Sequence, residues 1–215
     1  FLCLYLEYWL LVSQLADGAG NGLLVLLLLP MGIKRPKSFA FLNFFITFPA
    51  LKTNLTTRII MTKEELMRKA IELSVQNVAE GGGPFGAVIA RNGEIIAMGV
   101  NRVTPDCDPT AHAEVSAIRT AAKILGTFDL SGCEIYTSCE PCPMCLGAIY
   151  WAHLDRMYYG NSKKDAAKIG FDDAFIYEEL DLKPEDRRLK SEVLLPEEAI
   201  KAFQDWENKT DKVEY

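Results

Sequence analysis

Two short clusters of metal-binding residues restrict what this chain can fold into more than any other part of its sequence. The first is His112-x-Glu114, and the second is Pro141-Cys142-x-x-Cys145. One imidazole and two thiolates supply three ligands of a tetrahedral zinc site and leave the fourth position to water, as in catalytic zinc sites. We therefore predict that His112, Cys142 and Cys145 bind Zn²⁺, and that the fold brings these two segments together.

Glu114 lies two residues after the histidine, where its carboxylate can reach a zinc-bound water without ligating the metal. Zinc lowers the pKa of a bound water to about 7. A neighbouring carboxylate can take the water's proton and return it to a ring nitrogen and then to a departing amine. Both clusters have the spacing of the zinc nucleobase deaminases. We predict that Glu114 is the catalytic proton carrier of a hydrolytic deamination.

Each part of this pattern also has a structural interpretation. A single Cys-x-x-Cys is common in structural zinc knuckles, but such a site needs a fourth Cys or His, and His153 is the only other histidine of the chain. Glu114 alone could be a solvated helix residue. Cys139 could compete for the metal, or it could be a buried spectator thiol.

The chain contains six cysteines, and three of them fall within seven residues. This crowding indicates metal binding instead of a disulfide framework. Thiolate ligands must stay reduced, so we expect a cytoplasmic location.

Hydrophobic periodicity and turn residues predict alternating helices and strands from residue 62 onward. Thr62 and Glu65 form a predicted capping box, and Asn92-Gly93 predicts a hairpin. The predicted helices cover residues 62–79, 111–125, 143–152, 165–168, 173–180 and 196–208, and the strands cover 85–90, 95–103, 133–138, 157–160 and 190–195. This order predicts a three-layer α/β/α sandwich around a mixed five-stranded sheet.

Composition divides the chain near Met61. Residues 1–60 are apolar and carry five basic and two acidic residues, so subtracting their +3 from the overall −6 leaves −9 on residues 61–215. We interpret residues 1–60 as a non-native or disordered extension, with a targeting segment or a membrane anchor as alternatives. None of its apolar runs reaches the roughly 18 residues of a membrane span. The acidic 61–215 domain argues against nucleic-acid binding, which needs a basic face.

Over residues 61–215 the sequence resembles the cytidine deaminase superfamily and, within it, the bacterial-type guanine deaminases. The stretches that carry the resemblance are Gly83-Pro84-Phe85-Gly86-Ala87-Val88-Ile89, residues 108–115 around His112, residues 136–151 around the two zinc-binding cysteines, and Gly170-Phe171-Asp172-Asp173. The last of these and the terminal Tyr215 point more narrowly to guanine deaminase. The resemblance implies a cytidine deaminase-like fold with Zn²⁺ as cofactor and a purine base as substrate.

The resemblance also implies roles for residues outside the metal cluster. Asp173 would assist Glu114 in proton transfer, while Asn101 would hydrogen-bond the purine edge. The remaining residues implied to contact the substrate are Phe85, Ala113, Trp151 and Tyr215. Tyr215 would come from the partner, because the family forms a homodimer with exchanged C-terminal segments.

Alternatives remain open at both levels. Asn101 could be a turn residue, Phe85 and Trp151 could be core residues, and Asp173 could be a helix N-cap. At the level of the whole chain, deamination of adenosine in tRNA shares both clusters, and another aminated purine or a triazine is a further candidate substrate. A zinc-stabilised binding module without activity is the non-enzymatic alternative.

Overall fold

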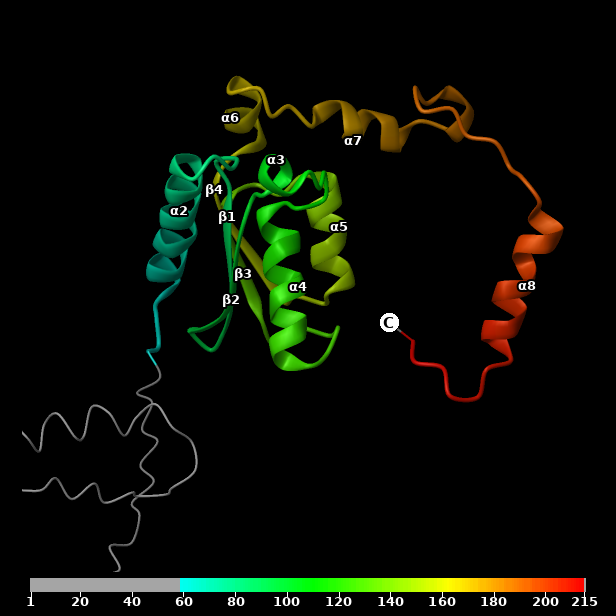
Figure 1. Ribbon diagram of the computed structural model, residues 1–215, viewed down its shortest axis with the longest axis horizontal. Coiled ribbons are helices and arrows are strands. Elements are labelled where there is room, and N and C mark those ends of the chain that lie inside the picture. The colour runs from blue at the N-terminus through cyan, green and yellow to red at the C-terminus, as the bar shows by residue number, and fades with distance from the viewer. Residues whose placement is uncertain (1–58, 215) are drawn as a thin grey trace, which may run out of the picture. The chain divides into compact units, whose positions relative to one another are not determined.

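The computed structural model describes residues 59–214. Its centre is a mixed sheet of four strands in the order β2-β1-β3-β4 (Figure 1). The strands are β1 (Gly86–Arg91), β2 (Glu94–Val100), β3 (Glu134–Cys139) and β4 (Arg156–Asn161). β1 pairs antiparallel with both β2 and β3, whereas β4 runs parallel to β3. The predicted mixed sheet is therefore confirmed, although with four strands instead of five.

Helices cover both faces of this sheet and make three layers (Figure 1). α2 (Lys63–Ala79) packs on one face, against β1 and β3, while α4 (Ala113–Leu125) packs against β2 and β1 on the other. α5 (Pro143–Trp151) lies beside α4. The short helix α3 (Val103–Asp106) occupies part of what the sequence predicts to be strand and loop.

The hairpin between β1 and β2 has the predicted turn. Asn92 and Gly93 both adopt positive φ angles, 52° and 79°. Two such residues in succession form a type I′ turn, whose twist matches that of the strands it joins. This hairpin puts residue 101, which follows β2, next to the start of β1: the Asn101 backbone N–H donates to the Phe85 carbonyl oxygen at 3.1 Å.

The α2 helix begins at the predicted capping box. The Thr62 backbone N–H donates to Glu65 Oε2 at 2.8 Å, and the Glu65 backbone N–H donates to Thr62 Oγ1 at 3.3 Å. Its buried stripe is Leu66, Ala70, Ser74 and Asn77. Ile71 and Val75 also recur at helical spacing, but both side chains are exposed.

The contact between α4 and the sheet is unusually close. A Cβ atom on Gly99 of β2 would collide with the Ala113 carbonyl oxygen and with the backbone nitrogen of Ala117. Ala113, Ala117 and Ala121 are fully buried along this side of α4. Small side chains on both elements therefore let the start of α4 rest directly on β2.

The C-terminal part consists of short helices after β4. They are α6 (Lys163–Lys168), α7 (Ala174–Asp181), the 3₁₀ turn η2 (Pro184–Asp186) and α8 (Pro196–Glu207). The strand predicted over 190–195 is wrong: these residues form no ladder, and Val193 is 80% exposed. Val193, Leu194 and Leu195 favour a strand, but a strand needs a neighbour to pair with, and no strand of residues 59–214 pairs with this segment.

Predictions for residues 1–58 and for Tyr215 lie outside the described residues. Within residues 59–214, no helix combines the length and the apolar character needed to cross a membrane.

Candidate active site

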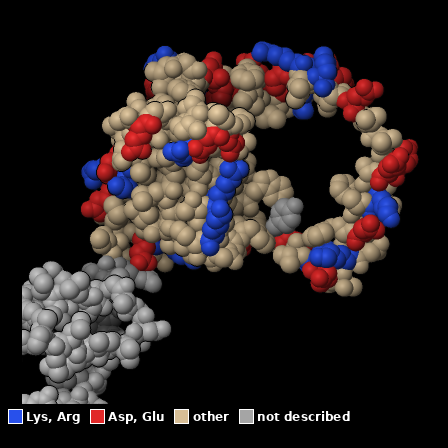
Figure 2. Space-filling view, viewed as in Figure 1, with Lys and Arg blue, Asp and Glu red and all other residues tan. Residues whose placement is uncertain are grey.

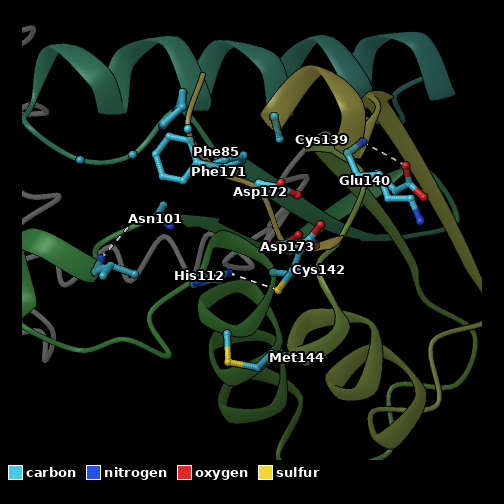
Figure 3. Close-up of a pocket in the computed structure, with 18 of the residues that line it drawn as sticks. Phe85, Asn101, His112, Cys139, Glu140, Cys142, Met144, Phe171, Asp172 and Asp173 are labelled. Atoms are coloured by element: carbon cyan, nitrogen blue, oxygen red, sulfur yellow. Dashed lines mark hydrogen bonds between the residues drawn. The ribbon is translucent and has the colours of Figure 1, made fainter. Parts of the chain in front are cut away.

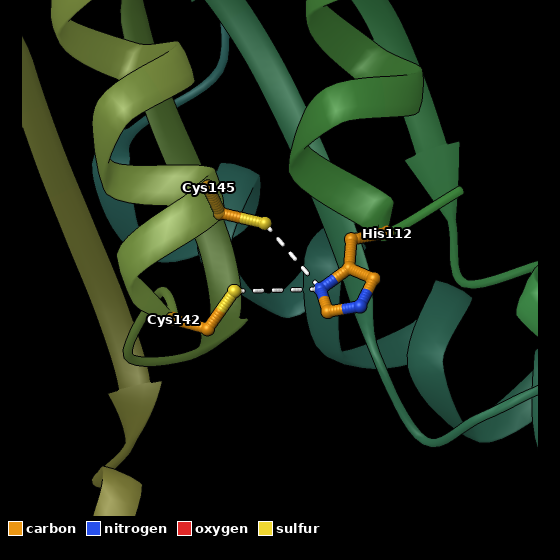
Figure 4. A group of neighbouring side chains, drawn as sticks. All are labelled: His112, Cys142 and Cys145. Atoms are coloured by element: carbon orange, nitrogen blue, oxygen red, sulfur yellow. Dashed lines mark hydrogen bonds between the residues drawn. The ribbon is translucent and has the colours of Figure 1, made fainter. Parts of the chain in front are cut away.

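Two helix N-termini bring the predicted metal ligands together. His112 is the N-cap residue of α4, one position before the first turn in which it was predicted, and Glu114 follows inside that turn. Cys142 is the N-cap residue of α5, with Pro143 at the first helical position and Cys145 in the first turn. Figure 4 shows the two sulfur atoms and the His112 ring facing one another.

The spacing of the three ligand atoms fits a tetrahedral zinc ion. His112 Nδ1 lies 3.6 Å from Cys142 Sγ and 3.5 Å from Cys145 Sγ. Zn–N and Zn–S bonds of about 2.0 and 2.3 Å at a tetrahedral angle separate N and S by roughly 3.5 Å. Among residues 59–214 these three form the one group of three or more such side chains close enough to hold a metal. The donor set therefore fits Zn²⁺ through Nδ1 of His112.

The two alternative ligands lie apart from this group. The Nδ1 atom of His153 is 3.5 Å from Asp129 Oδ1. Cys139 directs its Sγ to the Ser162 carbonyl oxygen at 3.6 Å, and burial raises the pKa of its thiol to about 11. Cys139 is thus a buried spectator thiol, and residues 59–214 supply no fourth ligand for a structural knuckle.

Hydrogen bonds within the cluster shift the pKa values of the Cys142 and Cys145 thiols in opposite directions. Hydrogen bonds from Cys145 and His112 lower the pKa of Cys142 to about 4. The pKa of Cys145 is strongly raised, first by its hydrogen bond to Cys142 and then by burial. The hydrogen bond to Cys142 also raises the pKa of His112. A cation that binds these ligands therefore displaces protons from Cys145 and, below its pKa, from His112.

Glu114 is buried beside the cluster and is not among the three ligand residues. It is only 6% exposed, its Oε2 accepts from Cys145 Sγ at 3.4 Å, and its Oε1 lies 3.5 Å from Thr137 Oγ1. Burial raises the pKa of its carboxyl group. A carboxylate with a raised pKa holds a proton more readily, which suits a group that must both take and return one.

A cavity of about 780 Å³ opens above these residues. His112, Glu114 and Cys142 line it together with Phe85, Asn101 and Asp173 (Figure 3). Asp173 is the N-cap residue of α7 but makes no side-chain capping bond. Its pKa is raised, first by burial and then by the charge of Cys142.

Two residues predicted to contact a substrate do not line this cavity, and a third lies outside the described residues. Ala113 is fully buried in the core between α4 and β2, flanked by two residues that do line the cavity. Trp151, the last residue of α5, is 64% exposed and does not line the cavity. Tyr215 lies outside the described residues. The roles assigned to these three stay predictions.

The sequence reasoning missed one aromatic residue of the cavity. Phe171 meets Phe85 edge to face, with ring centroids 5.0 Å apart (Figure 3). Phe171 lies two positions before Asp173 in the Gly-Phe-Asp-Asp stretch. This closeness to a predicted site residue was the sequence signal that could have identified it. Met144 and Lys163 also line the cavity, but neither carries a sequence signal that distinguishes it from a surface residue.

Comparisons with known proteins identify the family of this chain. Residues 60–161 match the family described as cytidine and deoxycytidylate deaminase zinc-binding region. The chain is 51% identical over 156 residues to guanine deaminase of Bacillus subtilis, covering 72% of this chain and all of that protein. The X-ray structure of guanine deaminase from Bacillus subtilis superimposes with a TM-score of 0.70 at 51% identity, over 72% of this chain and 99% of that one.

A second kind of relative matches over a shorter stretch. The tRNA-specific adenosine deaminase of Bacillus subtilis is 41% identical over 101 residues, which is 46% of this chain and 63% of that protein. The match to guanine deaminase is therefore both more similar and more complete.

Proposed function

The chain belongs to the cytidine and deoxycytidylate deaminase family of zinc-binding proteins, and we propose that it hydrolyses guanine to xanthine and ammonia. The observation that carries the proposal is the buried carboxylate of Glu114 beside three side chains that fit a zinc ion, at a cavity large enough for a purine base. The choice of guanine is supported by the similarity to guanine deaminase over that protein's whole length.

In the reaction, a C–O bond replaces the C–N bond at the amino-bearing ring carbon. When bound, zinc activates the water molecule that attacks this carbon. Glu114 takes a proton from the water and delivers it to the adjacent ring nitrogen, while the new C–O bond forms. It then carries the second water proton to the amino group, the C–N bond breaks, and ammonia leaves. Guanine and water are consumed, and xanthine and ammonia are produced.

Other residues of the cavity hold the base for this exchange. Asn101 Oδ1 accepts from the Val103 backbone N–H at 3.2 Å, so the Nδ2 hydrogens of Asn101 remain for an acceptor on the purine edge. Phe85, supported by its edge-to-face contact with Phe171, packs on the ring. Asp173 accepts a hydrogen bond from the amino side of the base and assists the proton transfer.

Deamination of adenosine in tRNA is the second candidate, and the shorter match to a tRNA-specific adenosine deaminase is the observation in its favour. Against it stands the −9 charge of residues 61–215. On the face that Figure 2 shows, basic side chains are interspersed with acidic ones, whereas a phosphate backbone is bound by a basic surface.

A direct assay separates these two candidates. The zinc-loaded protein is incubated with guanine and, separately, with tRNA, and ammonia, xanthine and inosine are measured. Xanthine and ammonia from guanine are the expected products. Inosine in the tRNA without xanthine from guanine would overturn the proposal.

The finer proposals concern assembly and location. A homodimer with exchanged C-terminal segments is supported by α8, which makes no extensive contact with other elements of residues 59–214 and exposes Phe203 and Trp206. Light scattering on the purified chain tests the dimer, and a monomeric mass would contradict it.

The reduced thiols of the metal cluster support a cytoplasmic location, and we propose that the catalytic domain begins near Met61.

A further inference from the structure

Asn77 is a buried polar residue that connects two walls of the cavity. It lies near the end of α2, is 2% exposed, and is surrounded by the chain segments on either side of the β1–β2 hairpin. Its Nδ2 donates to the carbonyl oxygens of Gly83 and Asn101, each at 2.7 Å. The backbone carbonyl oxygen of Asn77 accepts from the Gly82 backbone N–H at 2.8 Å. One residue therefore ties together Gly82, Gly83 and Asn101, all of which line the cavity.

The Asn101 side chain sits in a frame that these bonds define. Gly83 lies so close to it that a Cβ on Gly83 would be 2.9 Å from Asn101 Oδ1 and 3.0 Å from Asn101 Cγ. The Val103 backbone N–H holds the same Oδ1 from the other end. The Asn101 backbone is held in turn by Asn77 Nδ2 and Phe85 O. The carboxamide of Asn101 thus lies between Gly83 and the Val103 backbone N–H, and Asn77 bonds the backbones of both Gly83 and Asn101.

The Gly82-Gly83 turn is shaped by the same side chain. A Cβ on Gly82 would collide with both terminal atoms of the Asn77 carboxamide. The turn therefore packs its backbone directly onto Asn77, and there is no room for another side chain between them. The backbone of Gly82 is therefore in direct contact with the buried side-chain amide of Asn77.

We propose that Asn77 is a positioning residue for substrate binding: it orients the Asn101 carboxamide toward the purine edge by fixing the Gly83 and Asn101 backbones. This inference rests on the proposed function, in which Asn101 donates to the base. Asn77 does not line the cavity, so its effect on substrate passes through Asn101. Truncating it frees two carbonyl oxygens and lets the Asn101 carboxamide rotate.

The experiment is a double-mutant cycle on the zinc-loaded full chain with guanine as substrate. The variants are Asn77→Ala, Asn101→Ala and the double variant, with Ser74→Ala as the matched control. Ser74 is buried on the same side of α2, but its hydroxyl bonds only to the Ile71 carbonyl oxygen of its own helix. Initial rates give kcat and KM separately, zinc content is measured for each protein, and thermal unfolding reports stability.

We expect Asn77→Ala to lower kcat/KM on the order of ten- to a hundredfold, mainly through a higher KM, since misplacing a substrate-positioning group has effects of this size. In the Asn101→Ala background the same change should alter kcat/KM less than threefold, because residues that act through one another are not additive. Zinc content should remain equal in all variants. Ser74→Ala should keep the KM of the parent.

Gly83→Ala tests the same inference if Asn77→Ala does not fold. Gly83 has no positive φ angle, so the substitution adds only a Cβ against the Asn101 carboxamide. A raised KM with intact zinc supports the proposal. An unchanged KM in both variants, or equal effects of Asn77→Ala with and without Asn101, overturns it. If the zinc-loaded parent chain does not convert guanine at all, the proposed function fails first, and this inference fails with it.

Discussion

The carboxylate oxygen Oε2 of Glu114 lies 3.4 Å from the Sγ of Cys145, so the proposed proton carrier touches a predicted metal ligand. The contact joins the first turn of α4 to the first turn of α5. Because both helices begin at this point, a displacement of either helix N-terminus would change the distance between the predicted metal ligands and the Glu114 carboxylate. The chemistry of the site therefore depends on how each helix is seated on the sheet.

Replacing Glu114 by Gln should abolish turnover and leave the metal in place. Gln preserves the shape of the side chain but cannot accept a proton, so kcat should fall by about 10²- to 10⁴-fold. Activity on guanine and zinc content by elemental analysis are the two measurements. Glu72→Gln, on the exposed side of α2, is the control with the same chemical change. Retained activity, or loss of zinc, would show that the proposed role is wrong.

Substitution by serine should lower the zinc content of the protein at Cys145 and leave it unchanged at Cys139. Cys145→Ser removes a ligand from the cluster, so the purified protein should contain far less zinc and lose activity. Cys139→Ser changes a thiol whose Sγ faces the Ser162 carbonyl oxygen, and its zinc content should equal that of the parent. Zinc per chain, measured after dialysis against a weak chelator, distinguishes the two. Equal zinc loss in both would place Cys139 in the metal site.

Zinc binding should release protons, and their number should depend on pH. Near pH 7 the pKa of Cys142, lowered to about 4, makes it a thiolate already, whereas the raised pKa of Cys145 keeps its thiol protonated. Binding must remove that proton. The raised pKa of His112 adds a second released proton as pH falls through it. Calorimetry in buffers of different ionisation enthalpy measures the number, and a value near zero at pH 7 would contradict this account.

Gly99→Ala should destabilise the fold and disturb the site together. The added Cβ collides with the backbone of Ala113 and Ala117, and overpacking of this kind costs about 1–3 kcal/mol of unfolding free energy. Since α4 begins with His112 and Glu114, moving it off β2 also displaces one zinc ligand. Denaturant unfolding and zinc affinity report the two effects. Gly147→Ala, whose Cβ would meet nothing within 4 Å, is the matched control for the chemical change.

The local elements were predictable because their signals are local. The Thr62 and Glu65 capping box, the Asn92-Gly93 turn and Pro143 at the start of α5 each depend on residues a few positions apart. The strand over 190–195 failed for the opposite reason. Its apolar residues favour extended structure, but pairing requires a neighbouring strand, which no short stretch of sequence reveals.

The sequence by itself predicted the metal and the type of reaction, because the residue types and the spacing of His112, Glu114, Cys142 and Cys145 are those of the zinc nucleobase deaminases. Only the tertiary structure decided which other residues reach the cavity. It placed Phe171 against Phe85, left Trp151 and Ala113 away from the cavity, and set Asn77 behind Asn101. The reason is that packing against the sheet, and not position along the chain, orients these side chains. Asn77, which lies 24 positions before Asn101, thus bonds to it although no sequence motif connects the two residues.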